Sequence, residues 1–377
     1  MLYVGTYTEP ADDGKEIVPA GQGIYVFELD MDRRQALFRQ VLNETRNPSF
    51  LAAEGSRLYA CGEREDCAHA AAYRREKDGT LTFINSVDGE GAGSCHGVLC
   101  PDRRLLLVSN YVSGSVTAFS LAPDGSILGP KAVRHHHGRG SNLSRQESAH
   151  VHSAAVFPGG DYAAVADLGL DAVFLYGLDM EEDEKGRDVF CEEERGAEGK
   201  TVKWQARSQV RTAAGEGPRH MVFSGDGRHV YLVTELGNHL VHFTCGRGPW
   251  QMRESLELLP KGYERTPWTL AADVHMTKDG KFLYVSCRGY DKIAAFGVDK
   301  DGTPRHRGSF GCGGRGPRNF CISPDERWIA VANQYTGNVA VLPRNTVTGE
   351  PGEPVMEIAV PQAVCVVWTE DEKEESR

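Results

Sequence analysis

The sequence lacks the features that mark several classes of protein. Lys and Arg number 42 against 53 Asp and Glu, a formal net charge of −11, and no Lys/Arg-rich run is present. Nucleic acid is therefore not an expected partner. No apolar run approaches the ~18 residues of a membrane-spanning helix, and Met1–Tyr7 has neither a basic segment nor a small-residue cleavage site. We therefore expect a cytoplasmic protein with no membrane partner.

The sequence also lacks the spacing patterns of metal sites, disulfide scaffolds and serine esterases. Its ten cysteines show no metal-like or disulfide-framework spacing, and Cys287, Cys321 and Cys365 lie inside apolar strand patterns. Buried, reduced thiols are the simplest interpretation. No Gly-x-Ser-x-Gly motif is present, which argues against a covalent acyl-enzyme. No segment has the periodicity of a convincing amphipathic helix.

A hairpin that recurs along nearly the whole chain is present instead. In each copy a short apolar strand leads through a turn to a second strand rich in β-branched and aromatic residues. The turns contain residues that favour a reversal of the chain, as in Pro101-Asp102, Gly225-Asp226-Gly227 and Lys278-Asp279-Gly280. The clear copies cover residues 96–110, 152–167, 219–235, 272–288 and 318–334.

A third strand follows each hairpin, and a fourth, more polar strand can be placed after it. Weaker copies of the third strand at residues 23–27 and 69–73 bring the number of repeats to seven. Four antiparallel strands repeated about every 45 to 55 residues are typical of propeller blades. The sequence therefore predicts an all-β, seven-bladed β-propeller with four antiparallel strands per blade.

The two ends of the chain supply the two halves of one blade. Residues 363–368 have the pattern of a first strand without a second, and residues 1–5 have the pattern of a second strand without a first. Pairing these strands would close the ring and remove exposed sheet edges. We expect one propeller domain over residues 1–368 and an acidic, disordered tail over residues 369–377.

The hairpin register gathers polar residues at one mouth of the central channel. Arg219 and Glu235 are separated by sixteen residues, and so are Arg318 and Gln334. The first residue of one strand and the last residue of its antiparallel partner lie at the same end of a hairpin. The residues expected at this mouth are His152, Arg219, Glu235, Arg288, Arg318 and Gln334, with Ser49 and Glu63 from an earlier repeat.

A polar ring of this kind has two interpretations. Propellers often line their channel with polar residues that only hydrate it, and a single His or Arg there means little. Three arginines converging on one face are costly without an anionic ligand, and the net charge of the chain is −11. Because Arg binds phosphate and carboxylate groups in a bidentate manner, a small anionic molecule is the expected partner.

At these residues the sequence resembles the seven-bladed lactonase family, which includes bacterial 6-phosphogluconolactonases and fungal carboxymuconate-lactonising enzymes. The resemblance spans essentially the whole chain. The matching stretches are Val4-Gly5-Thr6-Tyr7-Thr8, Asn47-Pro48-Ser49-Phe50-Leu51, Cys95-His96, Ser109-Asn110-Tyr111, Gly138-Arg139-Gly140 leading to Arg145-Gln146, His150-Val151-His152, Gly217-Pro218-Arg219-His220, Thr234-Glu235-Leu236, Ser286-Cys287-Arg288, Gly316-Pro317-Arg318-Asn319 and Ala332-Asn333-Gln334.

The resemblance implies a catalytic set and a substrate-binding set. The catalytic set is His152, Glu235, Arg219 and Arg288. The substrate-binding set is Arg318, Gln334, His150, His220, Asn110 and Glu63. The sequence departs from the family at Ala149, where members often have proline, which leaves the conformation of that loop open. No carboxylate-rich ligand set can be assembled at this mouth, so neither a metal nor another cofactor is expected.

Opening a lactone requires a positioned water, a base, and positive charge beside the developing oxyanion. Glu235 and His152 are both candidates for the base. Flanking arginines would keep Glu235 ionised but lower its basicity, which favours His152 slightly. Arg219 or Arg288 would stabilise the oxyanion or hold a phosphate.

Three functions remain open at this point. The resemblance favours hydrolysis of 6-phospho-D-glucono-1,5-lactone in the pentose phosphate pathway. A second possibility is another lactone-forming or lactone-opening enzyme, such as a carboxymuconate cycloisomerase. A third is a non-catalytic propeller that binds other proteins, because a fold does not fix a function. The sequence does not determine the phosphorylation of the substrate, the arginine that would hold it, or the oligomeric state.

Overall fold

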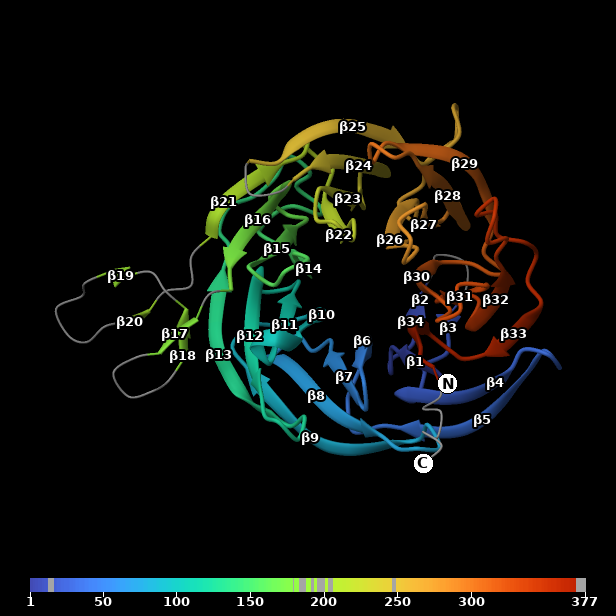
Figure 1. Cartoon of the computed structure of the whole chain (residues 1–377), viewed down its shortest axis with the longest axis horizontal. Coiled ribbons are helices and arrows are strands. Elements are labelled where there is room, and N and C mark those ends of the chain that lie inside the picture. The colour runs from blue at the N-terminus through green and yellow to red at the C-terminus, as the bar shows by residue number, and fades with distance from the viewer. Residues whose placement is uncertain are drawn as a thin grey trace.

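Seven four-stranded antiparallel sheets surround a common axis in this computed structural model (Figure 1). The structure describes residues 1–12, 17–178, 180–182, 188–190, 193–194, 201–202, 206–245 and 249–370. The seven-bladed propeller predicted from the hairpin repeat is confirmed.

The blades are numbered in chain order, each from its innermost strand outwards. Blade 1 is β34 (Ala363–Trp368), β1 (Leu2–Thr6), β4 (Ile24–Asp30) and β5 (Gln35–Leu42); blade 2 is β6 (Pro48–Glu54), β7 (Arg57–Gly62), β8 (Ala68–Arg75) and β9 (Leu81–Gly89); blade 3 is β10 (Ser94–Cys100), β11 (Leu105–Asn110), β12 (Ser115–Leu121) and β13 (Ile127–His135). Blade 4 is β14 (Val151–Val156), β15 (Tyr162–Asp167), β16 (Ala172–Gly177) and β21 (Ala206–Arg211); blade 5 is β22 (Pro218–Phe223), β23 (His229–Thr234), β24 (His239–Thr244) and β25 (Gln251–Glu257). Blade 6 is β26 (Leu270–Met276), β27 (Phe282–Arg288), β28 (Lys292–Val298) and β29 (Pro304–Gly311); blade 7 is β30 (Pro317–Ile322), β31 (Trp328–Asn333), β32 (Asn338–Pro343) and β33 (Met356–Ala359).

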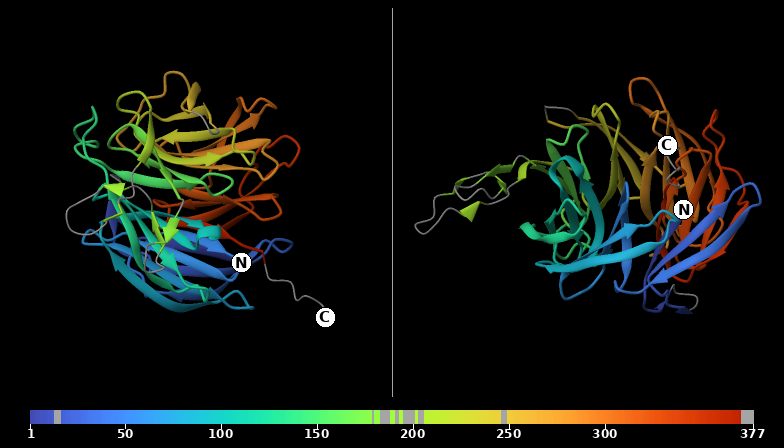
Figure 2. Two further views of the ribbon diagram at one scale, coloured as in Figure 1. Left: turned by 60° about the vertical axis from the view of Figure 1, so that its left-hand side comes forward. Right: turned by 60° about the horizontal axis from the view of Figure 1, so that its bottom comes forward.

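Three short strand pairs lie outside the blades. They are β2 (Ala11–Asp12) with β3 (Ile17–Val18), β17 (Met180–Glu182) with β18 (Asp188–Phe190), and β19 (Glu193–Glu194) with β20 (Thr201–Val202). The strands β17 to β20 stand away from the ring on the side of blade 4 (Figure 2). Of the tail expected at residues 369–377, residues 371–377 lie outside the described residues.

The ring closes where the two ends of the chain pair. Leu2 faces Trp368 and Val4 faces Val366 across the antiparallel pair of β1 and β34. The blade expected from the two terminal patterns is therefore present, and this closure fixes blade 7 against blade 2 through blade 1.

The core is divided into clusters between neighbouring blades. One cluster joins Leu107 of β11 to Val165 of β15, and another joins Val4 of β1 to Val341 of β32. Equivalent clusters lie between the other neighbouring blades. Because each sheet is covered on both faces, the second strands have continuous apolar runs rather than alternating ones. This packing accounts for the apolar second strands that define the repeat.

A repeated tyrosine contact ties each of four blades to the next. Tyr3, Tyr59, Tyr231 and Tyr284 occupy second strands, and each hydroxyl donates to a glycine carbonyl in an outer turn of the following blade. The O···O distances run from 2.6 to 3.0 Å. The phenol thus combines burial of its ring with a satisfied hydroxyl.

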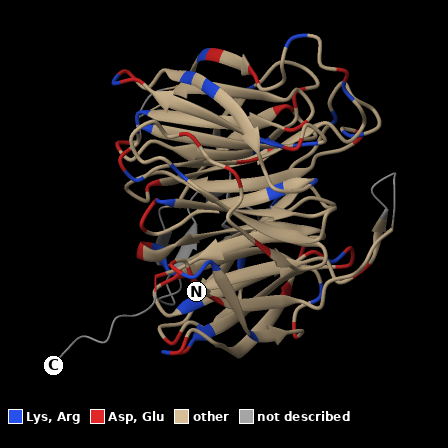
Figure 3. Ribbon diagram, turned by 90° about the vertical axis from the view of Figure 1, so that its right-hand side faces the viewer, with Lys and Arg blue, Asp and Glu red and all other residues tan. Residues whose placement is uncertain are grey.

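The described part of the chain contains one helical segment, the three-residue 3-10 turn η1 (Pro101–Arg103). None of its helices is long and apolar enough to cross a membrane. Nine described cysteines are free thiols, and Cys191 lies outside the described residues. Charged side chains of both signs are interspersed on the turns and outer strands (Figure 3).

Candidate functional site

Every innermost strand carries a β-bulge within its first few residues. In β14, Val151 pairs with Asp167 and Ser153 pairs with Ala166, so His152 is the extra residue. A one-residue shift also occurs in the other six inner strands, and in β22 and β26 it begins at Arg219 and at Ala272. A bulge redirects the extra side chain, and here it does so at one end of the axis. The bulge residues in chain order are Ser49, Cys95, His152, Arg219, Ala272, Arg318 and Val364.

A second set of residues follows the second strands at the same end. The Glu235 N–H donates to Gly217 O at 2.8 Å, and the Gln334 N–H donates to Gly316 O at 3.0 Å. Arg288 pairs with Leu270 at the corresponding place in blade 6. The members of this set are Tyr7, Glu63, Tyr111, Leu168, Glu235, Arg288 and Gln334. Each blade therefore presents two side chains at one mouth.

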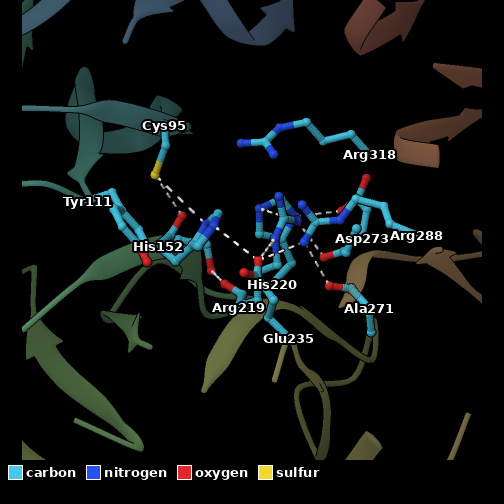
Figure 4. A network of polar contacts seen from close by, with 12 residues as sticks. Cys95, Tyr111, His152, Arg219, His220, Glu235, Ala271, Asp273, Arg288 and Arg318 are labelled. Atoms are coloured by element: carbon cyan, nitrogen blue, oxygen red, sulfur yellow. Dashed lines mark hydrogen bonds and ion pairs between the residues drawn. The ribbon is translucent and has the colours of Figure 1, made fainter. Parts of the chain in front are cut away.

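Glu235 lies at the centre of a buried ion cluster at this mouth (Figure 4). Arg219 donates through Nε to Glu235 Oε2 at 2.8 Å, and Arg288 donates through Nη2 to the same oxygen at 2.8 Å. Arg145 donates through Nη2 to Oε1 at 2.6 Å. The Glu235 side chain is 3% exposed. Both of its oxygens therefore have cationic partners.

Arg145 comes from the loop between β13 and β14 rather than from a blade. The neighbouring Gln146 is fully buried and donates to Leu168 O and to Asp171 Oδ1, both at 2.8 Å. These bonds fix the loop to blade 4, which places Arg145 next to Glu235. Arg145 also donates to the Tyr111 hydroxyl at 3.3 Å.

The charges in this cluster keep Glu235 ionised. Burial alone would raise the pKa of its carboxyl group, but Arg288 and Arg219 outweigh that effect and hold the pKa well below 4.5. Burial and the neighbouring Arg288 lower the pKa of Arg219 to about 10. At neutral pH Arg219 is therefore protonated and Glu235 is an anion.

His152 lies beside this cluster in a neutral state. Its Nε2 is 3.7 Å from Glu235 Oε2, and its Nδ1 is 3.8 Å from Cys95 Sγ. Burial and the positive charge of Arg219 lower the pKa of His152 well below 6.5. An uncharged imidazole has one free lone pair, so His152 is able to accept a proton at neutral pH.

Arg318 approaches the same space from the opposite side (Figure 4). Its Nη2 donates to the Tyr7 hydroxyl at 2.7 Å, and its guanidinium lies over the Tyr7 ring. Tyr7 in turn donates to Glu63 Oε2 at 2.8 Å. Among the described residues Arg318 forms no ion pair with a carboxylate. It is therefore the arginine of this group with the most unused donors.

A cleft of about 490 Å³ opens beside Tyr7, the hydrogen-bond partner of Arg318. Tyr7, Glu63 and Gln334 belong to its lining. The Gln334 amide donates to Gln362 Oε1 at 3.1 Å, whereas its own Oε1 is buried without a partner. The cleft thus reaches the mouth residues Tyr7, Glu63 and Gln334.

Three residues expected in the substrate-binding set have other surroundings. Asn110 is fully buried within blade 3, where it bonds Ser94, Ser115 and Thr117. His150 is stacked against Tyr111 at a centroid distance of 4.4 Å, and its two ring nitrogens lie near Tyr111 O and a Glu147 oxygen. His220 lies under Arg219, between it and Asp273.

The cluster carries an excess of positive charge. Arg145, Arg219, Arg288 and Arg318 face two carboxylates, Glu235 and Glu63, which leaves two positive charges in excess. No group of three or more His, Cys, Asp or Glu side chains among the described residues is arranged to hold a metal ion. The arrangement is suited to bind a small anion and to stabilise negative charge that develops during a reaction.

Comparison with known proteins places the chain in a family. The sequence matches the family described as "Lactonase, 7-bladed beta-propeller" over residues 1–368. The chain belongs to the seven-bladed β-propeller lactonase family. A 6-phosphogluconolactonase from Bacillus subtilis is 30% identical to this lactonase-family chain over 371 residues, covering 97% of each protein. A Formosa agariphila 6-phosphogluconolactonase is 27% identical over 357 residues, covering 93% of this chain and 94% of that protein.

A solved structure extends the likeness to three dimensions. The periplasmic gluconolactonase of Pseudomonas aeruginosa has a TM-score of 0.82 and 29% identity to this lactonase-family chain, and the match covers 97% of this chain and 98% of that one.

Several residues at the mouth of this lactonase-family propeller were missed from the sequence. Tyr7 and Tyr111 occupy positions equivalent to Glu235, and Cys95 occupies the position equivalent to His152. The sixteen-residue spacing could therefore have identified Cys95 and Tyr111. Arg145 lies in a loop that the repeat does not place, although its stretch was part of the family resemblance. Asp273 lies one residue beyond the bulge residue Ala272, and no motif or spacing in the sequence pointed to it.

Proposed function

We propose that the protein hydrolyses a sugar lactone at this mouth, and that the substrate is 6-phospho-D-glucono-1,5-lactone, which is opened to 6-phosphogluconate. The observation that carries the proposal is the surplus of arginines around a neutral histidine. The relatives named 6-phosphogluconolactonase support the choice of substrate. A cytoplasmic location and a place in the pentose phosphate pathway belong to the same proposal.

In the proposed reaction a water molecule attacks the lactone carbonyl directly. The water oxygen forms a bond to the carbonyl carbon while His152 Nε2 takes its proton, and the carbonyl oxygen becomes an oxyanion. When the oxyanion collapses, the ring C–O bond breaks and the ring oxygen takes the proton back from His152. The product is a hydroxy acid, and His152 returns to its neutral state.

Arg288 and Arg219 are the proposed partners of the oxyanion. The Nε–H of Arg288 is buried without a hydrogen-bond partner, so this arginine has a donor to offer a ligand. Glu235 holds the two guanidinium groups together through one oxygen. We assign Glu235 the role of orienting these arginines, because its own lone pairs are already engaged.

Arg318 is the proposed partner of the phosphate. It lies across the mouth from Glu235, lacks a carboxylate partner among the described residues, and borders the cleft through Tyr7. A lactone with its carbonyl near His152 would direct its phosphate-bearing end toward Arg318. Glu63 and Gln334, which line the cleft, would then contact the sugar.

The substrate preference of wild-type protein and Arg318→Ala tests this assignment. We expect kcat/KM to be much higher for the phosphorylated lactone than for gluconolactone, and Arg318→Ala to raise KM for the phosphorylated lactone alone, by about 10- to 100-fold for a lost charged hydrogen bond. Arg228→Ala, which removes an exposed arginine paired to Asp226, is the charge-matched control. Equal kcat/KM values in wild type would remove phosphate recognition from the proposal.

A further inference from the structure

A chain of buried polar side chains leads away from the mouth beneath Arg219. His220 follows Arg219 in β22, and Asp273 holds the equivalent position after the bulge in β26. His220 Nδ1 lies 2.7 Å from Asp273 Oδ1, and His220 Nε2 lies 3.3 Å from Arg219 Nη1. The chain therefore connects a buried carboxylate to an arginine of the candidate site.

Asp273 is an ionised acceptor in this chain. It is 3% exposed, and Asn319 Nδ2 donates to its Oδ2 at 2.6 Å while the Val274 N–H donates to its Oδ1 at 2.9 Å. Burial would raise the pKa of its carboxyl group, but His275 and His220 outweigh that effect and hold the pKa well below 3.8. An ionised carboxylate only accepts, so the ring proton of His220 must be on Nδ1.

This tautomer leaves a lone pair on His220 Nε2. Burial and Arg219 lower the pKa of His220 to about 4, so its ring is neutral at neutral pH. Nε2 then accepts from Arg219 Nη1, whose guanidinium is also held by Glu235 Oε2 and by Ala272 O. The ring centroid of His220 also lies 5.4 Å from that of His152.

We propose that Asp273 and His220 are positioning residues for lactone opening, in which Asp273 fixes the tautomer of His220 and His220 Nε2 holds Arg219 in place against Glu235 and the reacting carbonyl. This inference rests on the proposed function. It gives His220 a role in orienting an arginine rather than in touching the substrate.

Two substitutions at His220 separate positioning from simple packing. His220→Gln places an amide oxygen near the position of Nε2, where it still accepts from Arg219. His220→Asn places its amide near Nδ1 and does not reach. We expect His220→Asn to lose about 10- to 100-fold in kcat with little change in KM, because small misplacements cost that much, and His220→Gln to recover most of it. Equal losses for both would overturn the proposal.

The effect of Asp273→Asn should depend on His220. Alone, it should lower kcat about tenfold or more, because the tautomer of His220 is no longer fixed. In the His220→Gln background it should cost little further, because the glutamine oxygen accepts regardless of Asp273. An equal loss of kcat in both backgrounds would show that Asp273 does not act through His220.

His275→Gln is the matched control in the same network. His275 Nε2 lies 2.9 Å from Asp273 Oδ2, and its side chain is 40% exposed. We expect kcat and the melting temperature to stay near wild type. A loss as large as that of Asp273→Asn would make the network merely structural and overturn the proposal.

A spectroscopic readout keeps this inference separate from the proposed function. Nitrogen-15 NMR of the histidine rings should show His220 protonated at Nδ1 in the wild type and a changed tautomer in Asp273→Asn. Protonation at Nε2 in the wild type would overturn the proposal whatever the activity. A wild type with the expected tautomer but no activity on either lactone would instead overturn the proposed function.

Discussion

At the scale of single residues, Glu235 and His152 differ in how much of their hydrogen-bonding capacity is already used. Glu235 accepts from three arginines, and their charge makes it a weak base. His152 keeps a neutral ring with Nε2 at 3.7 Å from Glu235 Oε2. The contacts therefore favour His152 as the group that takes a proton from water.

The lowered pKa of His152 predicts the shape of the pH profile. A protonated imidazole does not accept a proton, and burial together with Arg219 delays protonation to a pH well below 6.5. We expect kcat/KM to stay constant as the pH falls through 6.5 and to decline only at lower pH, with Glu235 ionised throughout. The measurement is the initial rate of gluconolactone opening between about pH 4 and pH 8, the range of carboxylate and imidazole titration.

Two conditions make that profile interpretable. Gluconolactone is used because a phosphate monoester titrates near pH ~6, and this ionisation of the substrate would itself change the rate in that range. The rate of spontaneous opening is subtracted at each pH, because it rises with pH. An acid limb centred near pH ~6.5, the ordinary pKa of imidazole, would contradict a buried, neutral His152.

At the scale of elements, a β-bulge in each inner strand gives the site its geometry. The bulge of β22 begins at Arg219, and the chain reaches it through Gly217 and Pro218. Gly217 has a φ of +64°, and its N–H donates to Asp171 Oδ1 at 2.8 Å. A Cβ at this position would lie 2.8 Å from Leu236 Cγ. The turn that aims Arg219 therefore requires glycine.

Substitution of Gly217 tests this local requirement. We expect Gly217→Ala to lower the free energy of unfolding by about 1–2 kcal/mol, the cost of a left-handed non-glycine residue, and to lower kcat because Arg219 moves. Gly225→Ala, in the turn of the same hairpin, is the control because its φ is unstrained and no atom lies near its Cβ position. The measurements are the melting temperature and kcat, and indistinguishable values for the two variants would contradict the requirement.

Repeat register accounts for what was predictable from the sequence at this scale. Counting sixteen residues from Arg219 reaches Glu235, and the same count from Cys95 reaches Tyr111. Asn110 was expected in the substrate-binding set from the family resemblance, and it is the last residue of β11, one residue before the mouth residue Tyr111. A shift of one residue turns a strand side chain to the other face, so Asn110 points into the blade. Arg145 was not predictable by counting, because tertiary hydrogen bonds of Gln146 place its loop.

At the scale of the whole molecule, no single blade holds the site. His152 comes from blade 4, Arg219 and Glu235 from blade 5, Arg288 from blade 6 and Arg318 from blade 7. The apolar clusters between blades and the pairing of β1 with β34 fix these positions relative to one another. Prior organisation of charge of this kind is the main means by which such sites stabilise an oxyanion.

The turnover number of His152→Gln on the phosphorylated lactone, measured beside that of Glu235→Gln, tests the lactone site most directly. We predict that His152→Gln loses about 10²- to 10⁴-fold in kcat, the usual contribution of a general base, with little change in KM because Arg318 is intact. Glu235→Gln should lose less. Near-normal turnover of His152→Gln beside an inactive Glu235→Gln would make Glu235 the base, and full turnover of both would contradict a lactone site at this mouth.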